Sequence, residues 1–183
     1  MIWFSSDFHL AHKNIINYCN RPFKKVEEMD YKIFINMSKC LNSGDTLYFL
    51  GDLTFEEYVA EDFFKNFRHI TIHFITGNHD PVNVIAIASE YCASVSEIKD
   101  INIEDQNITL CHYAMRVWNK SHLNAWQLFG HTHGSLQPIG KQYDVSVDNN
   151  NFLPVSFEKI KDFMKNQPNN PNYIPPEKRN RTL

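Results

Sequence analysis

Short apolar segments that stop abruptly at a polar residue or a glycine constrain the fold of this chain more than any other sequence feature. Such segments occupy residues 2–6, 46–50 and 70–76, and Asp or Gly follows each one directly. Runs of this length, bounded by turn residues, are typical of buried strands. Apolar residues at helical spacing fill 27–41, between the first two runs. This alternation favours an α/β domain whose early strands are parallel.

The pattern changes after residue 94, where short apolar runs are separated by polar turns. We predict later strands at 95–98, 101–103, 107–111, 127–130 and 143–147. Closely spaced strands of this kind favour antiparallel pairing.

Three further helices are predicted. Pro81 suits a helix start and predicts one helix to about residue 90. Another fits 157–165. Thr54-Phe55-Glu56-Glu57 fits a capping box, so a third helix should follow it. The apolar residues of this third helix are expected to face the core rather than to form a base-stacking surface. They are Phe55, Tyr58, Val59, Phe63 and Phe67.

Length and composition favour one domain. The chain has 183 residues, 43% of them apolar, which is enough for a full core. We expect a single domain over 1–166, followed by an irregular tail over 167–183 that is rich in Pro and Asn.

Charge and cysteine content narrow the possible partners and the compartment. The net charge of −3 argues against binding of a long nucleic-acid polymer, which needs several basic contacts to phosphates. No apolar run approaches the roughly 18 residues of a membrane span, and no signal peptide is visible. The four cysteines form no C-x-x-C pair, so we expect reduced thiols in a cytoplasmic protein, with disulfides as the alternative.

Potential metal ligands follow five of the predicted strands. In open α/β sheets, sites form where strands end and loops begin. Carboxylate, amide and imidazole groups together suit a pair of divalent transition metals, and the absence of a thiolate argues against structural zinc. Asp52 is the natural bridge between two ions, which would lower the pKa of a bridging water and yield a hydroxide nucleophile. The groups are Asp7-x-His9, Gly51-Asp52, Gly77-Asn78-His79-Asp80, His112 and Gly130-His131-Thr132-His133.

These five motifs, present in order over residues 2–134, resemble those of the calcineurin-like metallophosphoesterase superfamily. The longer phrase over 7–16, the segment 20–23, and the Val-Asp and Pro-Val-Ser-Phe elements within 145–157 resemble a small single-domain branch found in bacteria and phages. The resemblance implies a four-layer α/β/β/α sandwich with two mixed β-sheets, which is a metallo-dependent phosphatase-like fold.

The resemblance also implies a role for each motif residue. One metal ion would be held by Asp7, His9, Asp52 and His133. The other would be held by Asp52, Asn78, His112 and His131. His79 would contact the substrate beside Asn78 and protonate the leaving oxygen, while Asp80 would orient that imidazole or its loop. Two departures concern loop shape: Ala11 stands where many relatives have glycine, and Tyr113-Ala114 follows His112 where a proline is common.

Three further residues are candidate phosphate contacts. His12 reads equally well as a substrate contact or a solvated residue. Arg21 and Arg116 could each clamp a phosphate through two oxygens, and a surface salt bridge is the alternative for both.

The expected activity is metal-dependent hydrolysis of a small phosphomonoester or phosphodiester, including a nucleotide or cyclic nucleotide. The expected cofactor is two divalent ions, Mn²⁺ first, with Fe, Zn, Ni or Co as alternatives. A catalytically silent scaffold on the same fold and a nuclease are the competing functions. No membrane partner is expected, and the sequence indicates neither the substrate nor the oligomeric state.

Overall fold

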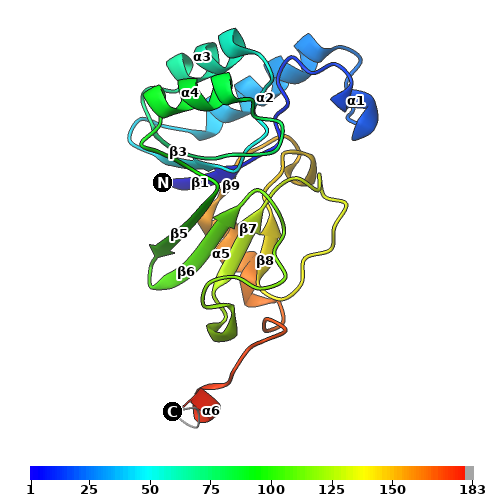
Figure 1. Ribbon diagram of the computed structural model, residues 1–183. Coiled ribbons are helices and arrows are strands. Elements are labelled where there is room, and N and C mark those ends of the chain that lie inside the picture. The colour runs from blue at the N-terminus through cyan, green and yellow to red at the C-terminus, as the bar shows by residue number, and fades with distance from the viewer. Residues whose placement is uncertain (180–183) are drawn as a thin grey trace.

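The computed structural model describes residues 1–179, which form two β-sheets covered by helices (Figure 1). The first sheet has the strand order β4-β3-β2-β1-β9. Four of its strands are parallel, and β9 pairs antiparallel with β1 at the edge. The strands of this sheet are β1 (Ile2–Ser5), β2 (Thr46–Phe49), β3 (Thr71–Ile75), β4 (Ser94–Ser96) and β9 (Val155–Ser156). The three early parallel strands were predicted correctly; the two-residue β9 was not predicted.

The second sheet has the strand order β5-β6-β7-β8. Its strands are β5 (Ile98–Ile103), β6 (Gln106–Cys111), β7 (Trp126–Phe129) and β8 (Gln142–Asp144). Only β5 and β6 pair antiparallel, because a short turn joins them, whereas β6–β7 and β7–β8 are parallel. Both sheets are therefore mixed, as expected, but the prediction of antiparallel pairing throughout the later strands was wrong.

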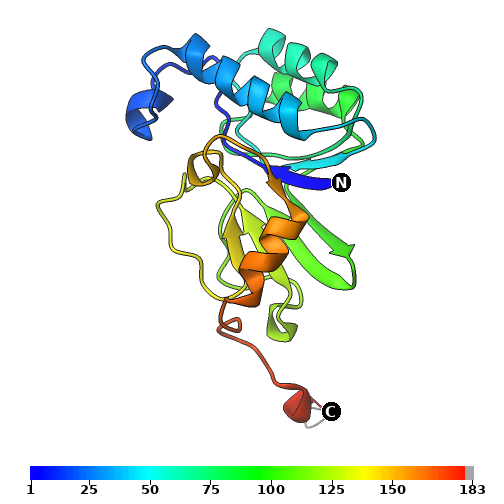
Figure 2. The same cartoon turned by 180° about the vertical axis from the view of Figure 1, so that it is seen from behind.

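Each sheet is covered by its own helices. Helices α2 (Val26–Cys40), α3 (Glu57–Asn66) and α4 (Val82–Tyr91) lie over the first sheet, and α5 (Phe157–Lys165) lies beside the second (Figures 1 and 2). One apolar core joins helix residues such as Ile33 and Phe63 to Phe49 and Phe74 of the first sheet. A second core joins both sheets to α5. The order of layers is helix, sheet, sheet, helix.

Two short α-helices, α1 (Ile15–Tyr18) and α6 (Pro176–Arg179), were not predicted. Two 3₁₀ helices, η1 (Ser121–Leu123) and η2 (Asp148–Asn150), complete the regular structure of residues 1–179. None of the helices formed by residues 1–179 combines the length and apolar character needed to cross a membrane.

Helix α3 begins later than the capping-box prediction. Thr54 Oγ1 accepts a hydrogen bond from Glu56 N, two residues on, and no side chain caps the helix at Glu56. As a result Phe55 precedes the helix and is 41% exposed, and Tyr58 is 69% exposed. The expectation that both face the core was wrong, whereas Phe63 and Phe67 are buried as expected.

Part of the C-terminal segment packs against the domain. Asn170 is buried; its side chain donates to the carbonyls of Ser121 and Ala125 and accepts from Lys141 N. The division into a domain over 1–166 and an irregular tail stays a prediction. All four cysteines are free.

Candidate metal centre

The loops that follow β1, β2, β3, β6 and β7 bring the predicted metal ligands together. Among the predicted ligands, two groups of three side chains have ligand atoms within 4.8 Å of one another, and a third group of this kind joins His133 to Cys19 and Asp148. The first group is Asp7, His9 and His133; the second is Asp52, His112 and His131. Residues more than 120 positions apart in the sequence thus meet in one place, at the ends of strands that belong to both sheets.

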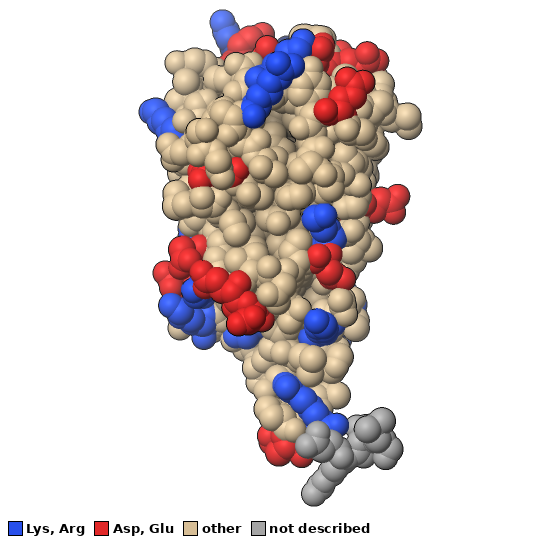
Figure 3. All heavy atoms as spheres, turned by 90° about the vertical axis from the view of Figure 1, so that its left-hand side faces the viewer, with Lys and Arg blue, Asp and Glu red and all other residues tan. Residues whose placement is uncertain are grey.

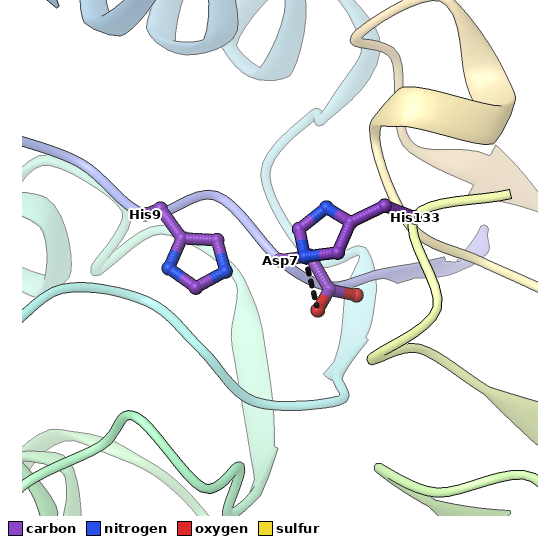
Figure 4. A group of neighbouring side chains, drawn as sticks. All are labelled: Asp7, His9 and His133. Carbon is purple, nitrogen blue, oxygen red and sulfur yellow. Dashed lines mark ion pairs between the residues drawn. The ribbon is translucent and has the colours of Figure 1, made fainter. Parts of the chain in front are cut away.

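In the first group, the side chains of Asp7, His9 and His133 face a common space (Figure 4). The rings of His9 and His133 are stacked with centroids 5.2 Å apart, and His133 Nε2 lies 3.8 Å from Asp7 Oδ1. Asp7 is fully buried, and its carboxylate accepts from Ser6 Oγ and His131 N.

Asp52 connects the two groups. Its Oδ2 atom lies 3.5 Å from His9 Nε2 and 3.4 Å from His112 Nε2. Asn78 Oδ1 lies 3.1 Å from His112 Nε2. A carboxylate oxygen placed between imidazole nitrogens of both groups is the arrangement expected of a bridging ligand.

Five of the seven predicted ligands have left-handed backbone conformations. Asp7, His9, Asp52, His131 and His133 have φ between 49° and 66°. This conformation costs roughly 1–2 kcal/mol for a residue with a Cβ, and such strain gathers at functional sites. Two backbone hydrogen bonds, Asp7 N to Gly51 O and His9 N to Asp52 O, hold the first two loops in place.

Glycines allow the strand ends to approach the carboxylates. A Cβ on Gly77 would lie 2.2 Å from Asp52 Oδ1, and one on Gly130 would lie 2.4 Å from Asp7 Oδ2. Neither position has room for a side chain, so the glycine of each motif is required by packing rather than by backbone angle alone.

Hydrogen bonds to the far ring nitrogens orient two of the histidines. His112 Nδ1 donates to Leu50 O at 2.7 Å, which leaves Nε2 facing Asp52. His133 Nδ1 is 2.6 Å from Asp148 Oδ2, which leaves Nε2 facing Asp7. A carboxylate or carbonyl behind a ligand histidine is the usual support of a metal site. Asp148 was missed by sequence reasoning, although it belongs to the Val-Asp element that carried part of the resemblance.

Arg21 does not have the predicted role of a phosphate contact. It is buried, and all three of its side-chain nitrogens are engaged within the protein. Nε and Nη2 both donate to the carboxylate of Asp148. Nη2 also donates to the carbonyl of Asp7. Nη1 donates to the carbonyl of Phe8 and to Met29 Sδ. The guanidinium therefore supports the Asp7–His9 loop from behind, and no donor is left for a substrate.

Asp80 shapes the loops rather than facing the site. Its carboxylate accepts from the backbone N–H groups of Asp52, Leu53 and Gly77. These hydrogen bonds join the loops that carry Asp52 and Gly77, and the role of Asp80 in orienting His79 stays a prediction. Burial raises the pKa of Asp80 against the effect of these hydrogen bonds.

The buried charges of the site favour a bound cation. Burial raises the pKa of Asp7 to about 7 and lowers that of His9 to about 3. Within residues 1–179, the buried Nε2 of His9 has no hydrogen-bond partner, although it faces Asp52. A buried acceptor nitrogen without a partner is costly, and a divalent cation would satisfy it together with the nearby carboxylates. The residues present therefore fit the expected metal ions.

The remaining candidates lie at different distances from this centre. His79 is exposed; its ring lies 5.5 Å from that of His9, and its backbone N–H donates to Asp52 Oδ1. His12 is half-buried, with its ring 5.7 Å from His9. Arg116 is exposed and lines a pocket with Trp118 and Leu136 that none of the seven predicted ligands lines.

The fold and the site together define a two-sheet α/β protein with paired carboxylate–histidine groups suited to metal ions. No family model matches the chain. It is 32% identical over 168 residues to the uncharacterized protein MJ1445 of Methanocaldococcus jannaschii, across 87% of this chain and 88% of that protein. The chain belongs to the family of that archaeal protein.

Solved structures share the fold to different degrees. A protein of unknown function from Aquifex aeolicus, AQ665, matches with a TM-score of 0.70 and 25% identity, over 89% of this chain and 98% of that one. An archaeal phosphodiesterase gives a TM-score of 0.47 at 16% identity, over 79% and 81% of the two chains. A likeness as weak as the second is uninformative about activity.

Proposed function

We propose that this protein is a metal-dependent phosphoesterase of the calcineurin-like superfamily. The observation that carries the proposal is the position of Asp52 Oδ2, 3.5 Å and 3.4 Å from ring nitrogens of His9 and His112. A carboxylate between two groups of ligands is what a binuclear centre requires. The order of the five motifs along the chain supports the same conclusion.

This geometry supports the two ligand sets that the resemblance implies. Asp7, His9, Asp52 and His133 would hold one ion. Asp52, Asn78, His112 and His131 would hold the other. When bound, the two divalent ions would neutralise the phosphoryl oxygens and lower the pKa of a coordinated water. Mn²⁺ is the first metal to test.

The residues around the ions position the substrate and move a proton. His79 is exposed beside His9, so its imidazole can reach a phosphoryl or leaving-group oxygen, stabilise the charge there and donate a proton. Asp52 Oδ1 accepts a hydrogen bond from the backbone N–H of His79. This hydrogen bond fixes the position of His79 relative to the proposed ions. Asp80 fixes the loops that carry both residues.

The test combines metal content with turnover. Purified protein supplied with Mn²⁺ is expected to bind about two ions per chain and to hydrolyse p-nitrophenyl phosphate or bis-p-nitrophenyl phosphate. Asp52→Asn should lose both properties, whereas Asp62→Asn, at an exposed position on α3, should lose neither. Elemental analysis and release of nitrophenol measure the two outcomes.

A second variant tests the role of His79. His79→Ala should keep both ions and lower kcat about 100-fold or more, because general acid catalysis contributes roughly 10²–10⁴-fold. His122→Ala is the matched control, because His122 is exposed and is not one of the predicted site residues. Metal binding without turnover of any ester would favour a scaffold, and absence of metal would end the proposal.

A further inference from the structure

Exposed aromatic side chains lie against the metal centre on two sides. Tyr113 is 47% exposed, and its ring lies 5.2 Å from His112 and 4.8 Å from His131. Phe55 is 41% exposed, and its ring lies 5.4 Å from His79 and 5.1 Å from His12. An exposed ring beside a polar site is in contact with whatever enters that site.

The two rings belong to different halves of the centre. Tyr113 adjoins the histidines grouped with Asp52. Phe55 adjoins His12 and His79, both of which contact His9 of the other group. Since Asp52 Oδ2 lies between His9 and His112, a phosphoryl group held at the centre would have one ring on each side.

Buried polar residues hold both rings in place. The side chain of Gln127, fully buried on β7, donates to Tyr113 O and accepts from Met115 N. Thr54 Oγ1 donates to Leu10 O and accepts from Glu56 N, which fixes the turn that carries Phe55. Such support is characteristic of positioned recognition groups.

A pocket of about 330 Å³ opens beside Tyr113. This volume falls in the range of small-ligand sites, roughly 300–1,000 Å³. It is lined by Thr76, Gly77, Glu97, Ile98, Cys111 and Tyr113. Gly77 and Cys111 immediately precede Asn78 and His112, so the pocket adjoins the centre. The Glu97 carboxylate disfavours a second phosphate there and can accept hydrogen bonds from N–H or O–H groups.

We infer that the substrate is a small phosphodiester with a planar, uncharged ring on each side of phosphorus, the class that includes short dinucleotides. This inference rests on the proposed function. One substituent occupies the pocket beside Tyr113, and the other lies on Phe55. The net charge of −3 argues against a long polymer. The face of the molecule seen in Figure 3 carries Lys and Arg together with Asp and Glu side chains and has no basic patch.

The kinetic test compares esters with one ring and with two. Wild-type protein with Mn²⁺ should have a higher kcat/KM for bis-p-nitrophenyl phosphate than for p-nitrophenyl phosphate. Tyr113→Ala and Phe55→Ala should each raise KM for the diester about tenfold and change kcat less, because each variant loses one ring on which a substituent stacks. Tyr113→Phe should keep the wild-type KM. For the monoester, only one of the two alanine variants should raise KM.

Controls separate the possible failures. Tyr31→Ala, at an exposed aromatic on α2, should leave both KM values unchanged. Saturation-transfer NMR should show contact of the diester's rings with metal-free wild-type protein, reduced in each alanine variant. Preference for the monoester, or unchanged KM in both alanine variants, would overturn the inference and leave the proposed function standing. Loss of all ester hydrolysis in wild type would overturn both.

Discussion

Asp148→Asn tests whether the carboxylate behind His133 supports the metal centre. The Asp148 side chain is 8% exposed and accepts hydrogen bonds of 2.8 Å from both Nε and Nη2 of Arg21, whose side chain is fully buried. Its third partner is His133 Nδ1. Removing one charge of a buried pair costs roughly 3–5 kcal/mol, because the other charge stays buried without compensation. The amide oxygen can still accept one bond, so we expect about 3 kcal/mol.

That loss is large relative to the roughly 5–15 kcal/mol by which domains are stable. For a chain of this size, roughly 2–4 °C of Tm per kcal/mol corresponds to a decrease of about 6–12 °C. Differential scanning calorimetry of metal-free protein measures it. Asp162→Asn, which breaks an exposed pair with Lys165, is the control and should leave Tm unchanged.

The same variant should change His133 itself. Burial alone would lower the pKa of His133, but the hydrogen bond to Asp148, aided by Cys19 and Asp7, raises it to about 10. The stability that this shift contributes is present below the ordinary histidine pKa and is lost as pH rises through 10. In Asp148→Asn, NMR titration should find the pKa returning toward its ordinary value, and metal affinity should fall about 10–100-fold. A Tm within 2 °C of wild type, or an unmoved pKa, would refute the reasoning.

Three further predictions follow from the loops around the centre. Gly77→Ala should displace Asp52, because the new Cβ would lie 2.2 Å from Asp52 Oδ1. Urea unfolding should show that the free energy of unfolding falls by about 1–3 kcal/mol, and elemental analysis should show that metal is lost. Gly44→Ala, whose Cβ meets nothing within 4 Å, should keep the metal. Ala11→Gly should raise stability by about 0.5–1 kcal/mol, since φ is 62° at Ala11 and the relief of strain exceeds the added chain entropy; a lower urea midpoint would contradict this. Metal binding should weaken as pH falls from 8 to 6, because a proton must be displaced from His133, whose pKa is raised to about 10, and below pH 7 also from Asp7, whose pKa is raised to about 7; equal Mn²⁺ affinity at pH 6 and pH 8, by calorimetric titration, would contradict it.

The sequence predicts those parts of the fold that local patterns determine. Helix α5 has the predicted limits of 157–165, and the early strands lie where apolar runs end at Gly or Asp. Strand pairing is decided by long-range contacts, so the parallel neighbours β6, β7 and β8 were assigned the wrong direction. The edge strand β9 has two residues and no periodicity to detect.

The same division holds for the site. The candidate ligands that the structure brings together could be found in the sequence because each group follows a strand. Asp148 and Arg21 were not assigned correctly, because their pairing spans 127 positions and neither lies in a strand-end motif. Phe55 was placed in the core because its spacing to Phe63 and Phe67 fits a helix, whereas the helix begins only after it. Local spacing cannot show where a turn releases a side chain to the surface.

The left-handed ligands give an argument for function that is independent of the sequence motifs. Ser6, directly before Asp7, is buried without positive φ, so burial at this sheet edge does not by itself impose the strain. Five residues at roughly 1–2 kcal/mol each would sum to a cost comparable with the stability of a whole domain. Hydrogen bonds such as Asp7 N to Gly51 O offset part of it. These conformations aim carboxylate and imidazole groups at one another in a buried place, which lowers stability unless a cation lies between them. Within residues 1–179, eight other residues with a side chain also have positive φ, Ala11 and Phe152 among them. The strain therefore supports the proposed metal centre only together with the way in which these five side chains face one another.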